Sequence, residues 1–120
     1  MHVTGVGGLF FRARDPKALQ AWYREHLGIG PGDSDWYWQQ QSGPTVFMPF
    51  QADTDYFPAE RQWMLNLRVR DLDGLLAKLG DSGITAETRA EWDSPETGRF
   101  ARIQDPEGLQ IELWEPPAGD

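Results

Sequence analysis

The stretch FRARD at positions 11–15 returns as LRVRD at positions 67–71, and this repeat decides the predicted fold. In both copies an apolar, alternating run leads into the RxRD pattern, and a helix-like pattern follows the aspartate. Apolar residues after the two copies fall at matching offsets, and a Leu-Gly pair closes each predicted helix. Repeats of about this period are typical of stacked units that share one core. The sequence therefore predicts two half-domains of one design.

The size and charge of the chain limit what it can be. At 120 residues, it is long enough for one domain, or for two small halves packed together. Hydrophobic residues make up 39%, with six Trp and six Phe, so the chain can fill a core and is not expected to be disordered. The net charge of -8 argues against nucleic acid and anionic membranes as partners, because both require clustered Lys and Arg.

The absence of cysteine excludes disulfides, thiolate catalysis and cysteine-based zinc sites. The N-terminus lacks the layout of a signal peptide, and no apolar run approaches the length of a membrane span. A soluble, cytoplasmic protein is therefore expected.

Local signals divide the chain into short elements. Asp15 followed by Pro16 predicts the start of a helix over 16–27, and Asp71 predicts the start of a helix over 71–79. The first half reads as β-α-β-β, with room for a further short strand near Ile29, and the second half reads as βαβββ. Residues 51–61 are interpreted as a linker between the halves or as a loop over a site. Alternation predicts strands at 3–13, 35–41, 45–50, 62–70, 84–91, 98–104 and 109–114, and DPEG at 105–108 predicts a turn.

One face of each predicted sheet is covered by a helix, and the other face mixes aromatic and polar side chains. A trough with mostly apolar walls and a few polar groups is typical of a small-molecule site. A partly solvated face, or a face buried in a dimer, is the alternative. Period-two alternation places on this face Phe10, Met64, Asn66, Arg68, Glu112 and Trp114.

The paired modules, together with AWYREHLG at 21–28 and DPEGLQIEL at 105–113, resemble the vicinal oxygen chelate superfamily. This superfamily contains glyoxalase I, extradiol dioxygenases, fosfomycin-resistance transferases and bleomycin-binding resistance proteins. The resemblance implies an α+β fold in which two βαβββ modules form a cupped mixed sheet with the helices on its outer face. It implies one domain over 1–120, with module 1 at about 3–52, a linker at about 53–61 and module 2 at about 62–115. Because most members pair two chains, a homodimer is expected.

Enzymes of this superfamily hold a divalent metal at four positions, which fall here at Gly8, about Phe47, Met64 and Glu112. Glycine and phenylalanine bring no side-chain ligand, and a thioether is too soft for hard divalent cations. The resemblance therefore implies no bound metal, and no other cofactor is expected.

Other metal-binding or charged groups have simpler interpretations. His2 is predicted to be terminal and His26 to be solvated on the first helix. Asp53, Asp55 and Glu60 are predicted to form a solvated charged loop.

The resemblance also implies which side chains face the cavity. In fosfomycin-type transferases the positions equivalent to Phe100, Arg102 and Gln104 face it, with Tyr37 and Gln39 as the first-half equivalents. The alternative parity of strand 35–41 turns Trp36 and Trp38 inward instead. The predicted site comprises Glu112 as the catalytic residue, with Phe10, Tyr37, Gln39, Phe47, Met64, Asn66, Arg68, Phe100, Arg102 and Trp114 as ligand contacts.

Glu112 has two interpretations that the sequence leaves open. It is either a ligand-binding or general-base carboxylate, or one partner of a structural ion pair with Arg68 or Arg102 that closes the two halves.

Three functions are weighed on this basis. The first is a metal-free protein of the glyoxalase/bleomycin-resistance type that binds a small aromatic or planar molecule through its aromatic walls. The second is a lyase, isomerase or dioxygenase-type enzyme that uses Glu112 as a base or metal ligand. The third is a regulatory or structural dimer with an empty groove.

Overall fold

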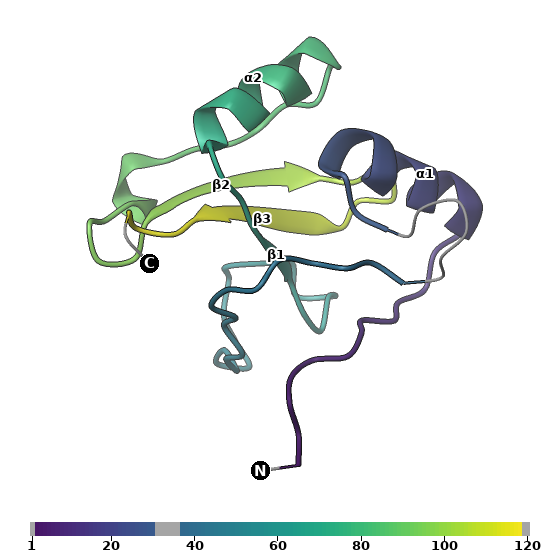
Figure 1. The fold of residues 1–120 in the computed structure, drawn as a ribbon, viewed down its shortest axis with the longest axis horizontal. Helices are drawn as coiled ribbons and strands as arrows, with labels where there is room; N and C mark the ends of the chain where they lie inside the picture. Colours follow the sequence, from purple (N-terminus) through teal and green to yellow (C-terminus); the bar gives the residue numbers. More distant parts are fainter. Residues whose placement is uncertain (1, 31–36, 119–120) are drawn as a thin grey trace.

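The computed structural model describes residues 2–30 and 37–118. A mixed sheet of three strands has the order β1-β3-β2, in which β1 is parallel to β3 and β2 is antiparallel to it. Both helices lie on one side of this sheet, and residues 37–64 run on the other side (Figure 1). The elements in chain order are α1 (Pro16–Leu27), β1 (Leu65–Arg68), α2 (Leu72–Asp81), the 3-10 helix η1 (Ala90–Trp92), β2 (Arg99–Gln104) and β3 (Gln110–Glu115).

The aspartates of the two repeat copies begin the two helices, as the sequence predicts. The Asp15 carboxylate accepts a hydrogen bond from the main-chain N–H of Ala18 at 3.1 Å, and that of Asp71 accepts from Gly74 at 3.2 Å. Each bond satisfies an N–H group that has no partner inside its helix. Helix α1 ends where Gly28 adopts a left-handed conformation, with φ of 68°.

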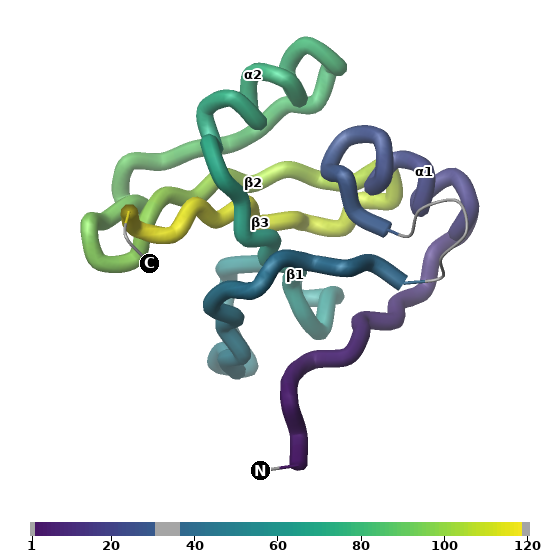
Figure 2. Tube along the Cα trace, viewed as in Figure 1, coloured from purple at the N-terminus to yellow at the C-terminus, as the bar shows by residue number. Residues whose placement is uncertain are grey.

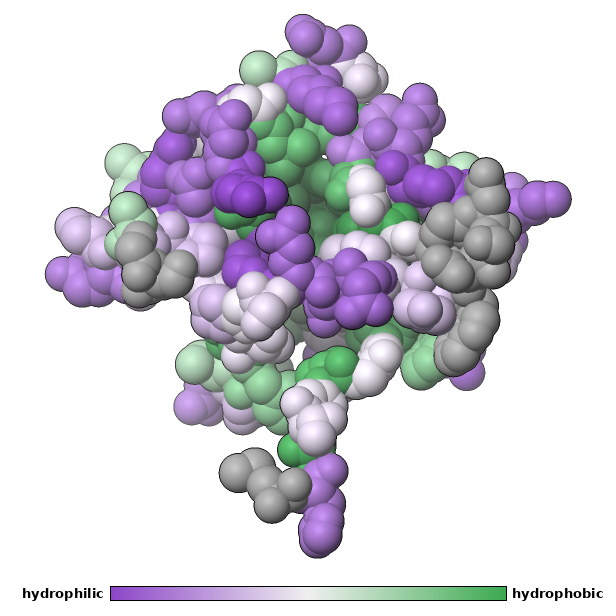
Figure 3. Space-filling model, in the orientation of Figure 1, coloured by the Kyte–Doolittle hydropathy of each residue, from purple (hydrophilic) through white to green (hydrophobic). Residues whose placement is uncertain are grey.

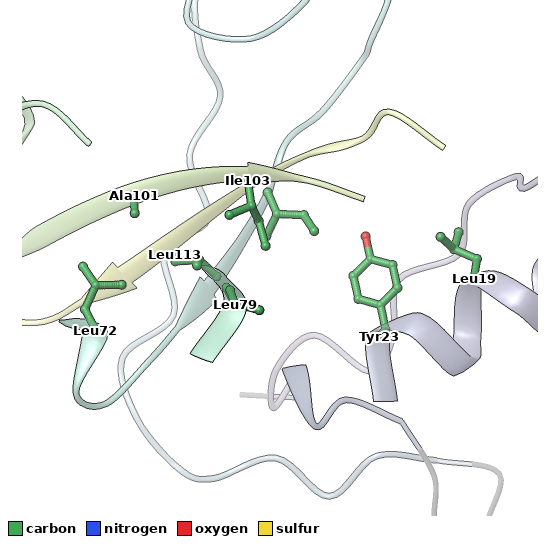
Figure 4. Close-up of a cluster of buried hydrophobic side chains, with 8 residues drawn as sticks. Leu19, Tyr23, Leu72, Leu79, Ala101, Ile103 and Leu113 are labelled. Atoms are coloured by element: carbon green, nitrogen blue, oxygen red, sulfur yellow. The ribbon is translucent and has the colours of Figure 1, made fainter. Parts of the chain in front are cut away.

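The core lies between the sheet and the two helices. Leu72 and Leu79 of α2 pack with Leu19 and Tyr23 of α1 against inward-facing strand residues (Figure 4). In β2 and β3 the apolar residues that face the helices occupy alternate positions, as period-two alternation requires. The buried apolar strand residues are Ala101, Ile103, Ile111 and Leu113.

Helix α1 is attached to the second half of the chain through the turn at 105–108. The Tyr23 hydroxyl donates to the buried carboxylate of Asp105 at 2.7 Å. The Glu107 carboxylate accepts from the main-chain N–H groups of Arg14 at 2.6 Å and Asp15 at 2.9 Å. These N–H groups hold the pKa of Glu107 below its usual value. The turn predicted from DPEG therefore also docks the first helix.

The first half of the chain differs from its predicted strands. Residues 3–13 and 45–50 are not paired into the sheet, nor are residues 37–41; positions 35 and 36 of that predicted strand lie outside the described residues. Figure 2 shows the N-terminal segment leading away from the sheet. The physical reason is that a strand requires a partner for its backbone N–H and C=O groups, and a lone hairpin is only marginally stable in water. Two complete βαβββ modules are consequently not seen among residues 2–30 and 37–118.

The predicted strand at 84–91 is also shorter than expected. Glu87 forms an isolated bridge with Arg102, and η1 begins three residues later at Ala90. Residue Glu87 therefore marks the outer edge of the sheet next to β2.

The surface seen from the viewpoint of Figure 1 is mainly hydrophilic, with apolar atoms visible in the hollow between the two helices (Figure 3). Within residues 2–30 and 37–118, no helix has the length and apolar character needed to span a bilayer.

Candidate functional site

The sheet face opposite the helices, called here the open face, gathers six of the predicted site residues. Strand register places Asn66, Glu112 and Arg102 in one row across the sheet. It places Arg68, Trp114 and Phe100 in the adjacent row. Since side chains alternate along each strand, these residues point away from the buried core positions.

Glu112 is the buried carboxylate of the open face, with 6% of its surface exposed. One oxygen, Oε1, accepts a hydrogen bond from the Asn66 side-chain amide at 2.6 Å. The other oxygen, Oε2, accepts a short hydrogen bond from the Tyr56 hydroxyl. Burying a carboxylate is costly unless its oxygens are hydrogen-bonded, and both oxygens of Glu112 are.

The arginines considered as ion-pair partners of Glu112 make other contacts in the described part of the chain. Arg68 donates to the main-chain oxygens of Pro44 and, at 2.7 Å, Gln41. Arg102 stacks between two aromatic rings. The structural ion pair that was one interpretation of Glu112 is therefore not formed.

The Arg102 guanidinium lies between the rings of Tyr56 and Trp92. Its Cζ atom is 4.1 Å from the centroid of the Tyr56 ring and 4.3 Å from that of Trp92. Such stacking is favourable because the ring face carries negative electrostatic potential. Within the described residues, Nε of Arg102 is buried without a hydrogen-bond partner.

A second aromatic surface occupies the next row of the open face. The rings of Phe100 and Trp114 are nearly parallel, with an interplanar angle of 11° and centroids 6.5 Å apart. The Trp114 indole N–H donates to the main-chain oxygen of Thr97 at 2.7 Å, which fixes the orientation of its ring. The open face thus combines a polar row with an aromatic row.

Tyr56, like Trp92, is a residue of this site that was not predicted from the sequence. It lies in segment 51–61, for which a loop over a site was one of the two interpretations. Burial foremost, and then the Glu112 carboxylate, raise the pKa of the Tyr56 phenol, against the lowering effect of Arg102. The phenol therefore stays protonated and remains a donor to Glu112. A lone tyrosine in a polar loop carries no spacing signal that would have identified it.

The remaining predicted residues lie outside the three-stranded sheet. Phe10 and Phe47 are 94% and 89% exposed, and Tyr37 and Gln39 are exposed in the same part of the chain as Phe47. Met64 directly precedes β1, and its sulfur accepts from the Gln110 side-chain amide at 3.1 Å. Whether these residues contact a ligand stays a prediction.

Two cavities are described, of which the larger shares Arg102 with the open face. The larger, of about 490 Å³, lies beside β2 and has Arg102 in its wall, together with Trp22, residues 83–87, residues 103–106 and Gln110. The smaller, of about 230 Å³, lies between the N-terminal segment and the 105–108 turn, and includes Phe10, Arg12 and Trp63. Neither wall includes Glu112 or Tyr56.

The four positions at which related enzymes hold a metal do not fit a divalent ion here. Gly8 and Phe47 carry no side-chain donor atom, and the Met64 sulfur is hydrogen-bonded to Gln110. Both oxygens of Glu112 are held by protein donors. In the part of the chain that the structure describes, no three His, Asp or Glu side chains converge as metal ligands.

Comparison with known proteins identifies the class. Residues 8–114 match the model of the glyoxalase-like domain, and the chain belongs to this family. The predicted resemblance is thereby confirmed.

Among solved structures, the chain is similar to TnmS3, an antibiotic binding protein from Streptomyces sp. CB03234. The identity is 26%, the TM-score is 0.57, and the match covers 97% of this chain and 98% of TnmS3. A glyoxalase/bleomycin resistance protein from the same source is 26% identical over 83% of this chain and 90% of its own, with a TM-score of 0.45. No curated protein sequence matches the chain.

Proposed function

We propose that this protein binds a small planar or aromatic molecule on the open face, without a metal. The observation that carries this proposal is the row formed by Asn66, Glu112 and Arg102. There a buried, hydrogen-bonded carboxylate lies next to a guanidinium that already stacks on aromatic rings. Where a ligand takes the place of the Tyr56 side chain, such a row offers a flat surface for an aromatic ring and a charged acceptor for a polar group at its edge.

Two further findings support this proposal. TnmS3, which matches nearly the whole chain, is an antibiotic binding protein. The residue types at the four metal positions favour a member of the family that works without a divalent ion.

A thermal-shift titration with planar aromatic compounds and, separately, with Ni, Zn, Mn and Fe tests this function. Ligands that bind the native state raise its stability with the logarithm of their saturation. We expect a concentration-dependent rise in Tm with at least one class of aromatic compound and none with the metals. The variant Arg102→Met, which keeps an apolar stem but removes the stacking guanidinium, is expected to weaken the response. One metal ion bound per chain would contradict the metal-free assignment.

The burial of Glu112 favours a second candidate function, a metal-free enzyme that uses this carboxylate as a general base. A proton abstraction next to a carbonyl group suits a carboxylate with this environment. A ligand recovered chemically unchanged after prolonged incubation supports binding alone, whereas conversion that is lost in Glu112→Gln supports the enzyme.

We further propose the domain organisation predicted above, with module 1 at about 3–52, a linker at 53–61, module 2 at 62–115, and two chains per assembly. The support is the exposure of apolar side chains in the unpaired first module. Phe10 is 94% exposed, Phe47 is 89% exposed, and Val46 and Met48 are also exposed. Large apolar patches of this kind are typical of surfaces that are covered in an assembly.

Light scattering coupled to size-exclusion chromatography checks the oligomeric state. We expect a dimer at micromolar concentration and a shift to monomer in Phe10→Glu and Phe47→Glu, because each change buries a charge in the interface. Glu96→Lys, at an exposed position in the loop before β2, serves as the control and keeps the dimer. A wild-type chain that stays monomeric at high concentration would contradict this proposal.

A further inference from the structure

Tyr56 is the only aromatic side chain described here that bonds to the carboxylate of the open face. Its hydroxyl donates to Glu112 on β3, and its ring lies 4.1 Å from the Arg102 guanidinium on β2. Its main-chain oxygen accepts from the Gln110 side-chain amide at 3.2 Å. One side chain from outside the sheet therefore contacts both charged groups of the polar row, the Glu112 carboxylate and the Arg102 guanidinium.

These contacts have the form of ligand contacts rather than core packing. Tyr56 is only half-buried, and it reaches the site from segment 51–61, which contains no helix or strand. The Arg102 guanidinium, whose buried Nε has no hydrogen-bond partner among the described residues, forms a flat platform between two rings. A planar ring on this platform that carries a hydrogen-bond donor at its edge can donate to Glu112 Oε2 as the Tyr56 hydroxyl does.

Apart from the contacts of Tyr56 itself, the hydrogen bond described between this segment and a distant part of the chain is that from the Arg61 side chain to the main-chain oxygen of Glu107, at 3.4 Å. Thr54 bonds within the segment, to the main chain of Gln51 and through its hydroxyl to the N–H of Tyr56. The Phe50 ring packs against the rings of Tyr56 and Phe57, and the side chains of Asp53 and Asp55 are exposed. Segments with few buried contacts open locally at low free-energy cost.

We propose that Tyr56 occupies the ligand subsite of the open face, and that the ligand replacing it is a planar aromatic molecule with a hydroxyl or similar donor at its ring edge. This inference rests on the proposed function and adds a chemical class to its ligand. A ring that carries only ethers or carbonyls leaves Glu112 Oε2 buried without a donor, which is unfavourable. The site therefore selects hydroxylated rings over their methylated counterparts.

Self-occupation lowers the apparent affinity of the resting protein. The apparent dissociation constant equals the intrinsic constant divided by the fraction of molecules in which Tyr56 has left the subsite. Removing the Tyr56 side chain raises this fraction to one. Binding of the same ligand then becomes tighter without any new contact.

Isothermal titration calorimetry with 2-naphthol and 2-methoxynaphthalene tests the proposal, because the two probes share a ring system and differ in the donor. We expect Tyr56→Ala to bind 2-naphthol about tenfold more tightly than wild type does. We expect this variant to prefer 2-naphthol over 2-methoxynaphthalene by about tenfold or more, the contribution of a hydrogen bond to a charged acceptor. Adding Glu112→Leu, which removes the acceptor and leaves an apolar side chain in its place, is expected to abolish the preference.

Asp55→Ala is the matched control, since Asp55 is an exposed neighbour in the same segment. It is expected to leave the affinity for 2-naphthol within about twofold of wild type. If wild type and Tyr56→Ala bind 2-naphthol equally well, the self-occupied subsite is overturned while the proposed function stands. Equal binding of both probes by Tyr56→Ala overturns the donor requirement. If neither protein binds any aromatic compound, it is the proposed function that fails.

Discussion

Replacing Asp105 by alanine is expected to lower the free energy of unfolding by about 3–5 kcal/mol. Asp105 is 5% exposed, and its carboxylate accepts three hydrogen bonds. Two come from the main-chain N–H groups of Glu107 at 2.8 Å and Leu109 at 3.0 Å, and one comes from the Tyr23 hydroxyl. Alanine leaves these three donors without an acceptor in a buried turn. Urea unfolding followed by tryptophan fluorescence measures the loss.

The variant Asp105→Asn is the control, because asparagine keeps the shape of the aspartate side chain and removes only its charge. Its side-chain oxygen still accepts from the two main-chain N–H groups, and its amide can donate to the Tyr23 oxygen, so we expect a clearly smaller loss than for alanine. An Asp105→Ala protein within about 1 kcal/mol of wild type would show that the turn does not anchor α1.

The second large effect is a loss of stability at alkaline pH that depends on Tyr23. Burial, followed by the adjoining Asp105 carboxylate, raises the pKa of Tyr23 well above its ordinary value of 10.0. Above about pH 10, the ordinary pKa of tyrosine, the unfolded chain releases the phenol proton while the native state retains it. Stability therefore falls as pH rises, by up to about 1.4 kcal/mol for each pH unit above about 10. Below pH 10 both states are protonated, and this contribution to stability is fully present.

Unfolding free energies measured between pH 8 and pH 12 for wild type and Tyr23→Phe isolate this effect from other groups that titrate in the same range. Tyr23→Phe is expected to be less stable at neutral pH, because Asp105 loses a donor, but to show a shallower decline above about pH 10. Parallel declines in the two proteins would mean that Tyr23 is not the group responsible.

The second half of the fold could be predicted from sequence because its signals are local. Asp71 and the following apolar spacing predicted α2, and DPEG at 105–108 predicted the turn before β3. Alternation in 109–114 separated the buried Ile111 and Leu113 from Glu112 and Trp114. Caps, turns and alternation act over a few residues, so they can be recognised without knowledge of the tertiary structure.

The first half could not be predicted in the same way, because a strand depends on its partner. Residues 3–13 and 45–50 have strand-like composition, but no strand of this chain pairs with them among the described residues. Tyr56 was missed for a related reason. Its contacts join it to Glu112, which lies 56 positions later in the sequence, and to Arg102, which lies 46 positions later. No local sequence pattern predicts contacts over such separations.

The central position of β3 in the sheet has a consequence for folding during translation. Both of its neighbours, β1 and β2, precede it in the chain, and β3 is the strand of this sheet with which each of them pairs. The sheet therefore cannot form on the ribosome until residues 110–115 have emerged. At ordinary elongation rates the aromatic side chains of the N-terminal segment wait on the order of ten seconds for it. During this interval the nascent chain exposes apolar surface to chaperones and to neighbouring chains on the same messenger RNA.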